Sequence, residues 1–246
     1  LEQLDDISSF SASQRIQIES ELENKEIINE KAIKEFLETL FFPIYHLDFE
    51  TFQQAVPQWR GISPFMQIPF QFSVHMEDES GELTHFEFLA KEGEDPRYSL
   101  AKALVETIPT DVCVLAYNMS FEKGVIKKLA EQFPEFAKHL MNIHKNIKDL
   151  MTPFQKKECY MPSMRGSYSI KYVLPALVPE MEHAYKELDL VHNGGEAMEA
   201  FAKLQEMQGG DEKARLRESL LRYCELDTLA MVKVLETLKN QMQKQP

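Results

Sequence analysis

The sequence lacks several features that would place it in a specialised class of proteins. It has no apolar run close to the roughly 18 residues that a membrane-spanning helix needs. Its first thirty residues are polar and acidic, unlike a secretory signal peptide. Its three cysteines, Cys113, Cys159 and Cys224, form no C-x-x-C pair and no metal-binding spacing, which indicates a reducing compartment rather than a disulfide scaffold. We therefore expect a cytoplasmic protein that does not act on membranes.

Positive charge is also scarce. The chain has 27 Lys and Arg against 40 Asp and Glu, a formal net charge of −13. This balance argues against a protein that coats nucleic acid non-specifically, because such binding depends on Lys and Arg neutralising phosphates. A hydrophobic content of 43% excludes wholesale disorder, and 246 residues are ample for a large buried core. Because the chain begins with Leu1 rather than Met, we expect it to be a piece of a longer polypeptide.

Hydrophobic periodicity predicts an α/β protein. We interpret residues 1–43 as an N-terminal helical segment, the end of a linker from a preceding domain, with one helix over residues 14–40 capped by Ser13. Residues 44–246 form the main domain. Strands are expected at residues 44–51, 67–75, 83–90 and 112–117, with residues 143–150 ambiguous, and helices at residues 97–108, 119–133, 168–174, 196–207 and 211–240. Three strands in succession followed by α–β alternation predict a mixed five-stranded sheet flanked by helices, the layout of the RNase H-like fold.

The first group of functional candidates is Asp48 and Glu50 in the string LDFETF. Residues i and i+2 of a strand point to the same face, so both carboxylates stand side by side. Adjacent carboxylates in an apolar strand repel each other and lose hydration, and a divalent cation removes both penalties. The alternative is an edge strand with its polar face in water.

Two further acids follow along the chain, each with an ordinary explanation when taken alone. Glu122 falls in the first turn of a helix that follows a buried strand, where the helix dipole favours an acid. Asp227 shares one face of the last helix with Tyr223, next to an apolar stripe, and a hydroxyl or lysine partner would account for it. Asp149 has the ordinary interpretation of a helix cap.

Taken together, Asp-x-Glu, Asn-x-x-Phe-Glu and Tyr-x-x-x-Asp in this order resemble the DEDD (DnaQ-like) 3′→5′ exonuclease superfamily of the RNase H-like fold, in its tyrosine subclass. The strings PFQFSVH, AYNMSFEK, GSYSIKYVLPAL, HNGGEAM and YCELDTLAM are similar to those of an uncharacterised bacterial family of DnaQ-like domains. The resemblance covers roughly four-fifths of the chain.

The resemblance implies a role for each matching position. Asp48, Glu50, Glu122 and Asp227 would ligate two divalent ions, Mg²⁺ or Mn²⁺, and Tyr223 would orient the attacking water. The acid of the second motif is usually Asp, whereas Glu122 is one methylene longer, and this departure puts the geometry of the second metal in question. The resemblance also suggests a fused N-terminal domain of nuclease type.

Local charge indicates where a substrate would bind. Residues 123–171 contain ten basic and four acidic residues, a local charge of +6. We assign substrate binding to five polar residues near the proposed metal ligands or at the start of the helix after Gly166: Thr51, Asn118, Ser167, Ser169 and Lys171. Tyr160, Tyr168, Tyr172 and Phe154 are candidates for stacking on bases, and Trp59 for base contact. The alternative is a solvated basic face beside core aromatics.

These observations predict a divalent-metal-dependent 3′→5′ exonuclease acting on single-stranded or frayed ends of DNA or RNA. One alternative is a catalytically weak RNase H-like domain that binds nucleic acid or protein within a larger polypeptide. Another is an oligoribonuclease-like enzyme that uses the same residues on short substrates.

Overall fold

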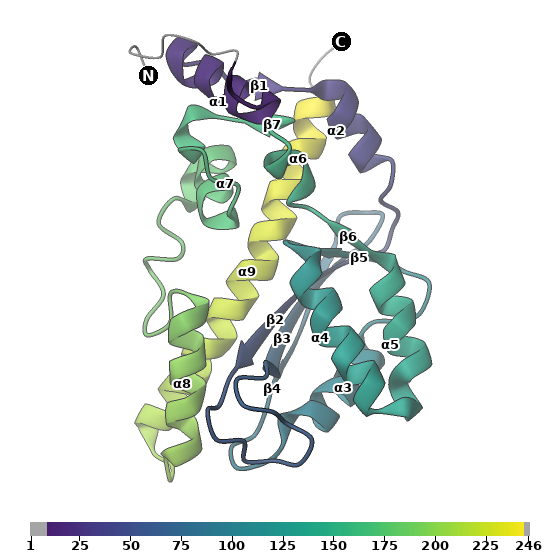
Figure 1. Ribbon diagram of the computed structural model, residues 1–246, viewed down its shortest axis with the longest axis vertical. Helices are drawn as coiled ribbons and strands as arrows, with labels where there is room; N and C mark the ends of the chain where they lie inside the picture. Colours follow the sequence, from purple (N-terminus) through teal and green to yellow (C-terminus); the bar gives the residue numbers. More distant parts are fainter. Residues whose placement is uncertain (1–8, 244–246) are drawn as a thin grey trace.

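Five strands form the central sheet of the computed structural model, which describes residues 9–243 (Figure 1). They are β2 (Ile44–Phe52), β3 (Ile68–Glu77), β4 (Leu83–Leu89), β5 (Cys113–Ala116) and β6 (Ile147–Asp149), in the spatial order β4-β3-β2-β5-β6. The first three strands are antiparallel, whereas β5 and β6 run parallel to β2. The predicted mixed five-stranded sheet flanked by helices is therefore confirmed.

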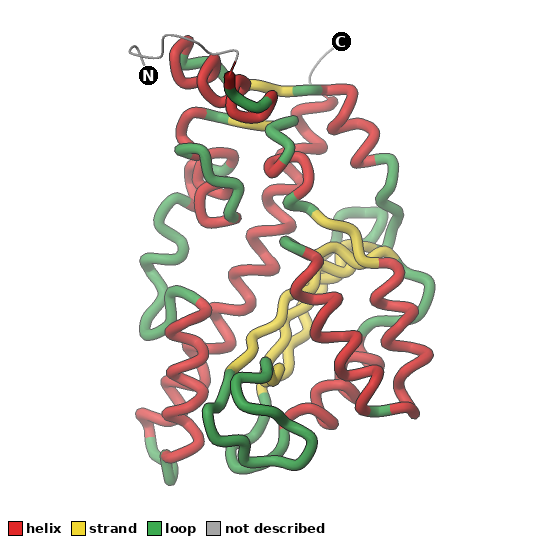
Figure 2. The backbone as a smooth tube through the Cα atoms, viewed as in Figure 1, coloured by secondary structure: helices red, strands yellow, loops and turns green. Residues whose placement is uncertain are grey.

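Helices cover both faces of this sheet (Figures 1 and 2). On one face lie α3 (Pro96–Thr107), α4 (Met119–Gln132) and α5 (Pro134–Asn146), which bury Leu47 and Phe49 of β2. On the other lie α7 (Ile170–Leu177), α8 (Gly194–Glu206) and the 33-residue α9 (Asp211–Gln243). Because side chains alternate along a strand, Asp48 and Glu50 point to the face that α9 covers.

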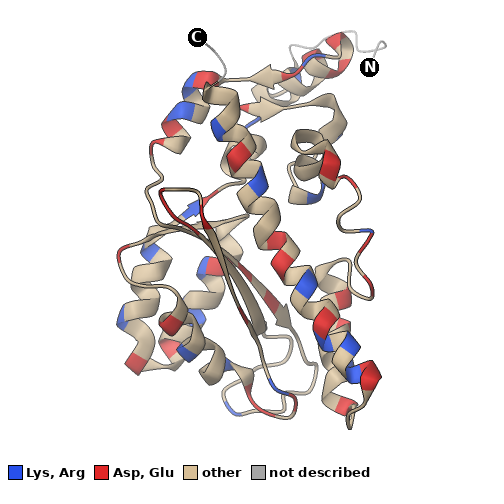
Figure 3. Cartoon of the chain, turned by 180° about the vertical axis from the view of Figure 1, so that it is seen from behind, with Lys and Arg blue, Asp and Glu red and all other residues tan. Residues whose placement is uncertain are grey.

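The α9 face contains two hydrophobic clusters, and α9 contributes to both. One joins Ile44 and Leu115 of the sheet to Val234 and Leu238 near the C-terminal end of α9. The other is built around Phe70, whose ring stacks on that of Phe201 with centroids 4.0 Å apart. Acidic and basic residues are interspersed along the length of α9 (Figure 3). Its inner surface holds the helix against the sheet.

The N-terminal segment differs from the prediction of a single helix over residues 14–40. It forms α1 (Ala12–Glu23), the short strand β1 (Ile27–Ile28) and α2 (Glu30–Leu37). The cap of α1 is Ser11 rather than Ser13, and Asn24 ends the helix in the left-handed conformation at φ 48°. Strand β1 pairs with β7 (Cys159–Tyr160). Ile33 of α2 is fully buried in the first cluster, so the segment packs against the rest of the chain.

Two other elements were incompletely predicted. Helix α5 was not predicted, and its last residues fall in the range 143–150 whose prediction is ambiguous. Helix α7 continues through Pro175 to Leu177. A proline in the last turn removes a single backbone hydrogen bond, and the next turn still closes, since Val178 N–H donates to Leu174 O at 2.7 Å. The remaining short elements are α6 (Thr152–Gln155) and 3₁₀ turns at Pro162–Met164 and Pro179–Met181. Within residues 9–243, none of the helices has the length and apolar character needed to cross a membrane.

Candidate metal centre

Three acidic side chains from distant parts of the sequence meet between β2 and α9. Asp48 and Glu50 come from β2 and Asp227 from α9, and one carboxylate oxygen of each lies within 4.8 Å of the others. Alternation along β2 aims the first two at the helix, and α9 crosses the sheet at the height where Asp227 faces them. A register shift in the β2–β3 pairing directly follows Glu50, at Thr51. The structure thus brings together three of the four predicted ligands.

These carboxylates are poorly hydrated and repel one another. Glu50 is 7% exposed and Asp227 is 9% exposed. Burial, followed by the charge of Asp227, raises the pKa of Asp48 well above its ordinary value. Burial and the charges of Asp48 and Asp227 raise the pKa of Glu50 in the same way. Burial also raises the pKa of Asp227, against opposing hydrogen bonds and the charge of Lys171. The cluster is therefore a site of stored electrostatic repulsion that a cation would relieve.

Glu122, the fourth predicted ligand, approaches from the first turn of α4. The turn before it is held by Asp149, whose Oδ1 accepts from Asn118 N–H at 3.0 Å and whose Oδ2 accepts from Met119 N–H at 3.2 Å. Asn118 has φ 73°, so the chain turns sharply from β5 into the helix. Asp149 is not itself an N-cap residue, since Asn118 and Met151 hold those positions in α4 and α6, but its carboxylate accepts from backbone N–H groups where both helices begin.

The carboxylate of Glu122 lies outside the three-oxygen cluster but near it. Its side chain is buried at 2% exposure, and its Oε2 has no hydrogen-bond partner within the described residues 9–243. Burial, followed by the charge of Asp48, raises its pKa well above the ordinary value. A buried carboxylate oxygen without a partner is unfavourable, and a cation or a hydrogen-bond donor beside this atom would remove that cost.

Two tyrosines line the other side of the cluster. Tyr223 is buried one turn before Asp227 on α9, and its hydroxyl helps lower the pKa of Asp227. Tyr185, from the loop between α7 and α8, donates a hydrogen bond to Asp227 Oδ1 at 2.6 Å. Sequence reasoning missed Tyr185, because a residue in an irregular loop carries no periodic signal.

Lys171 supplies the positive charge of the centre. Its Nζ donates to His192 O at 2.9 Å and lies 5.0 Å from the ring centre of Tyr185 and 5.3 Å from that of Tyr223. Its charge lowers the pKa of Asp48, Glu50 and Asp227, opposing the effect of burial. The predicted substrate-binding lysine therefore stands beside the carboxylates.

The other predicted substrate-binding residues lie on the rim or farther out. Thr51 is half-buried on β2, Asn118 is exposed, and Ser169 is the exposed N-cap of α7 without a side-chain capping bond. Ser167 Oγ accepts from Ser169 N–H at 3.2 Å. Within residues 9–243, none of these four side chains forms a hydrogen bond with the three clustered carboxylates.

The aromatic candidates divide into two groups. Tyr168 and Tyr172 are 42% and 44% exposed and remain available for stacking. Tyr160 and Phe154 are each 1% exposed, so the prediction that they stack on bases is wrong. Trp59 packs edge-on against Phe52, with ring centres 6.1 Å apart, and serves the core.

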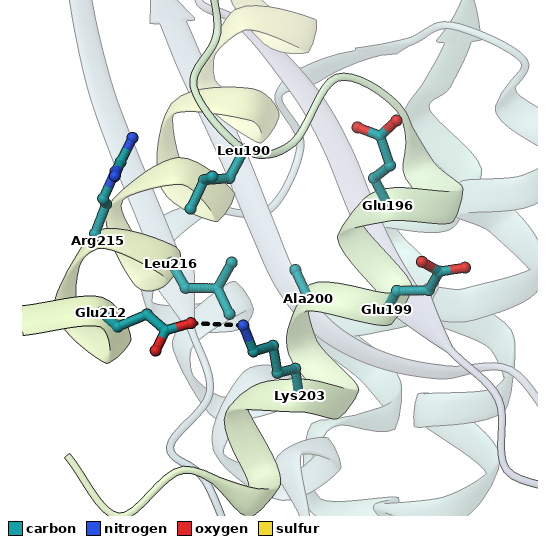
Figure 4. A pocket seen from close by; sticks show the side chains of 8 residues that line it. All are labelled: Leu190, Glu196, Glu199, Ala200, Lys203, Glu212, Arg215 and Leu216. Atoms are coloured by element: carbon teal, nitrogen blue, oxygen red, sulfur yellow. Dashed lines mark hydrogen bonds and ion pairs between the residues drawn. The ribbon is translucent and has the colours of Figure 1, made fainter. Parts of the chain in front are cut away.

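The N-terminal turn of α8 also lies beside the carboxylate centre, next to Glu50. Asn193 caps the helix, and a Cβ placed at Gly194 would lie 3.6 Å from Glu50 Oε2, so the backbone of the HNGGEAM string closely approaches that carboxylate. A hollow of about 540 Å³ lies between α8 and α9, and its lining includes none of Asp48, Glu50, Glu122 and Asp227 (Figure 4). An ion pair between Lys203 and Glu212, 2.6 Å apart, spans part of this hollow.

Fold and site together define an α/β protein with a buried, all-oxygen carboxylate centre. The chain belongs to the family described as "Domain of unknown function (DUF2779)", whose profile matches residues 45–169, half of the chain. That range includes Asp48, Glu50 and Glu122 but ends before Asp227. "Uncharacterized protein UU173" of Ureaplasma parvum serovar 3 is 28% identical over 158 residues, 60% of this chain and 23% of that protein. The chain thus spans about a quarter of that relative's length, and no solved structure matches it.

Proposed function

We propose that this chain is a divalent-metal-dependent 3′→5′ exonuclease of the DnaQ-like DEDD superfamily, tyrosine subclass, with an RNase H-like fold. The observation that carries the proposal is the convergence of Asp48, Glu50 and Asp227, whose oxygens come within 4.8 Å although the residues lie up to 179 positions apart. The strand order, with an antiparallel meander beside parallel strands, supports the fold assignment.

The residues present fit a pair of hard divalent ions. All candidate ligands are carboxylates, the donors that Mg²⁺ and Mn²⁺ prefer, and none is a cysteine or histidine. The unpartnered Oε2 of Glu122 and the mutual repulsion of the other three acids are both relieved by positive charge. Asp48, Glu50, Asp227 and Glu122 would hold the ions, which supply water activation and charge neutralisation in phosphoryl displacement.

The other side chains of the centre position the reactants. Burial and the nearby carboxylates raise the pKa of Tyr223, so its hydroxyl stays protonated beside Asp227, where it would orient the attacking water. Tyr185 holds Asp227 in place. Lys171 offers its ammonium to a non-bridging phosphate oxygen.

The surroundings favour a short nucleic-acid end over a long duplex. Basic residues exceed acidic ones only locally, over residues 123–171, within a chain of net charge −13. Long duplexes need many phosphate contacts, whereas an end needs few. Exposed Tyr168 and Tyr172, at the start of α7, offer flat surfaces on which unpaired bases stack.

The test is degradation of 5′-labelled single-stranded DNA, single-stranded RNA and short oligonucleotides with Mg²⁺, with Mn²⁺ and with chelator. Asp48→Asn and Asp227→Asn remove one ligand each without changing side-chain size. Glu236→Gln on the exposed side of α9 is the matched control, because it pairs only with Lys233. We expect a stepwise ladder from wild type and Glu236→Gln, and none from the other two variants.

Activity unchanged in both aspartate variants would contradict the assignment of the site. Bound nucleic acid without degradation by wild type would favour the other candidate, a binding domain within a larger polypeptide. A ladder restricted to the short oligonucleotides would assign the enzyme to oligoribonuclease-like substrates.

A further inference from the structure

A second group of metal-binding side chains lies on the same face of the sheet, toward its β4 edge. His75 of β3, His85 of β4 and Glu225 of α9 present ligand atoms within 4.8 Å of one another. The two imidazole rings stack with centres 4.6 Å apart, and His85 Nδ1 lies 3.8 Å from Glu225 Oε1. None of these residues belongs to the carboxylate centre.

The hairpin between β3 and β4 fixes this arrangement. Asp78 Oδ1 accepts hydrogen bonds from the N–H groups of Ser80 and Glu82, and Gly81 adopts φ 83°. The turn places His75 directly opposite His85. Both rings then face α9, which brings Glu225 over them.

A network of hydroxyl groups determines where the ring protons lie. Thr228 Oγ1 lies 3.0 Å from Glu225 O, which can only accept, so the hydroxyl proton of Thr228 points there. Ser73 Oγ lies 2.7 Å from Thr228 Oγ1 and must then donate its own proton to it. His85 Nε2, 2.9 Å from Ser73 Oγ, must donate in turn. His75 Nδ1, 2.7 Å from Thr228 Oγ1, donates as well.

This is the single arrangement of protons in which all four contacts are hydrogen bonds. In this arrangement the second ring nitrogens, His75 Nε2 and His85 Nδ1, meet no donor within residues 9–243. Burial, with the neighbouring His85 and His46, lowers the pKa of His75 to about 4, so its ring is neutral at pH 7. Neither ring thus uses both of its nitrogens in hydrogen bonds, and His85 Nδ1 lies 3.8 Å from Glu225 Oε1.

We propose that His75, His85 and Glu225 form a second metal site, which takes one transition-metal dication such as Zn²⁺ and fastens α9 to β3 and β4. Two imidazoles and one carboxylate suit zinc, with water as the fourth ligand. A hydrogen bond on the other nitrogen of each ring is the usual device that orients a ligating histidine. The His85 and Glu225 side chains are 24% and 45% exposed, which opens a path for the ion.

The site shares no ligand with the carboxylate centre, so zinc binding here does not depend on the proposed nuclease activity. A bound ion would act on that centre only by fixing the position of α9. Glu225 lies two residues before Asp227, and Ser73 is the register partner of Asp48. An ion bound here holds the helix that carries Tyr223 and Asp227 at a fixed height over β2.

The test is zinc binding by the whole chain in excess Mg²⁺, which occupies the carboxylate centre. Calorimetry gives the stoichiometry, and Co²⁺ as a probe reports tetrahedral nitrogen and oxygen ligation by its visible absorption. His85→Gln and Glu225→Gln remove one partly exposed ligand each. Ser73→Ala removes the acceptor that orients His85. Asp48→Asn and the exposed His183→Gln are the controls.

We expect one zinc per chain in wild type and both controls, and loss of that binding in His85→Gln and Glu225→Gln. Ser73→Ala should weaken it about 10- to 100-fold. Zinc at 100 times its Kd should raise the Tm of wild type by about 5–10 °C and leave that of His85→Gln unchanged. Absence of zinc binding by wild type, retention of it in both ligand variants, or its loss in Asp48→Asn would overturn the proposal.

Discussion

Tyr185 donates a 2.6 Å hydrogen bond to Asp227, and this bond joins an irregular loop to the middle of the longest helix. The same loop runs on to His192, whose carbonyl oxygen accepts from Lys171. The loop therefore holds both an acid of the carboxylate centre and the lysine that balances its charge. A loop with these two contacts is part of the site.

Replacement of Tyr185 by Phe tests this contact. The net contribution of a typical hydrogen bond is about 0.5–1.5 kcal/mol, so we expect activity to fall roughly 3- to 10-fold, with weaker Mn²⁺ binding. Tyr223→Phe should instead lower kcat by about 100-fold or more, because it removes the group that orients water. Steady-state kinetics on a labelled oligonucleotide and Mn²⁺ titration separate the two effects. Equal losses of kcat in both variants would contradict these separate roles.

The substitution Asp48→Asn should stabilise the metal-free protein but remove the stabilisation that wild type gains from metal. In the unfolded chain an aspartate loses its proton at about pH 4, whereas the raised pKa of Asp48 lets the folded chain keep the proton at higher pH. The free energy of unfolding of the metal-free protein therefore falls as the pH rises above about 4. In chelator at neutral pH, the variant should therefore be more stable than wild type, on the order of 1 kcal/mol or 2–4 °C in Tm. In saturating Mn²⁺ wild type should gain stability and the variant should not. Thermal unfolding in chelator and in Mn²⁺ measures both effects, with Glu236→Gln as control. A lower Tm for Asp48→Asn than for wild type in chelator would contradict the repulsion among the three carboxylates.

Lys171→Gln should weaken substrate binding more than catalysis. The change removes one phosphate contact, so KM should rise about tenfold at low salt and the slope of log affinity against log salt should fall by about 0.7. It also removes the charge that lowers the pKa of Asp48, Glu50 and Asp227, so the metal-free protein should be less stable. Lys186→Gln, an exposed lysine of the nearby loop, is the control. An unchanged salt slope would show that Lys171 meets no phosphate.

Asp149→Ala should destabilise the turn that presents Glu122. The carboxylate accepts hydrogen bonds from the N–H groups of Asn118, Met119 and Met151, and charged bonds contribute about 1.5–3 kcal/mol. We expect about 2 kcal/mol, or 4–8 °C in Tm. Asp189→Asn, which breaks an exposed pair with Arg215, should change stability by less than about 1 kcal/mol. Urea unfolding of both variants measures the difference, and equal values would contradict the role of Asp149.

Phe201→Ala should weaken the attachment of α8 to the sheet. Its ring stacks on Phe70 and also packs against Phe52, and its loss leaves a cavity that costs about 3–5 kcal/mol. Phe65→Ala, at a loop residue that is 66% exposed, should cost less than about 0.5 kcal/mol. Denaturant unfolding of both variants measures the difference. A loss of stability in Phe201→Ala as small as that in Phe65→Ala would show that the cluster repacks around the missing ring.

Periodic features of the fold and site were accessible from sequence. Alternation in the β2 and β3 strings predicts which face each side chain takes, and the spacing of Tyr223 and Asp227 predicts a shared helix face. Those two patterns place Asp48 and Glu50 on one face of β2 and Tyr223 and Asp227 on one face of α9, and the fold then brings the two faces together.

The remainder depends on contacts between distant segments. Tyr185 reaches Asp227 from an aperiodic loop, and His75 meets His85 only once the hairpin register is set. The break between α1 and α2 follows from Asn24 and the pairing of β1 with β7, a partner more than 130 residues away. The burial of Tyr160 has the same origin, since its hydroxyl donates to Glu21 of α1 at 2.6 Å.

Because α9 contributes to both hydrophobic clusters on its face of the sheet, neither cluster can open without the other. The helix thereby makes this half of the protein one cooperative unfolding unit, in which backbone amides near Asp227 exchange with solvent as slowly as those of the core. We expect proteases to cut α9 near Asp227 only after global unfolding, whereas the connection between α7 and α8 has exposed residues such as Lys186 and Glu187 in the folded state.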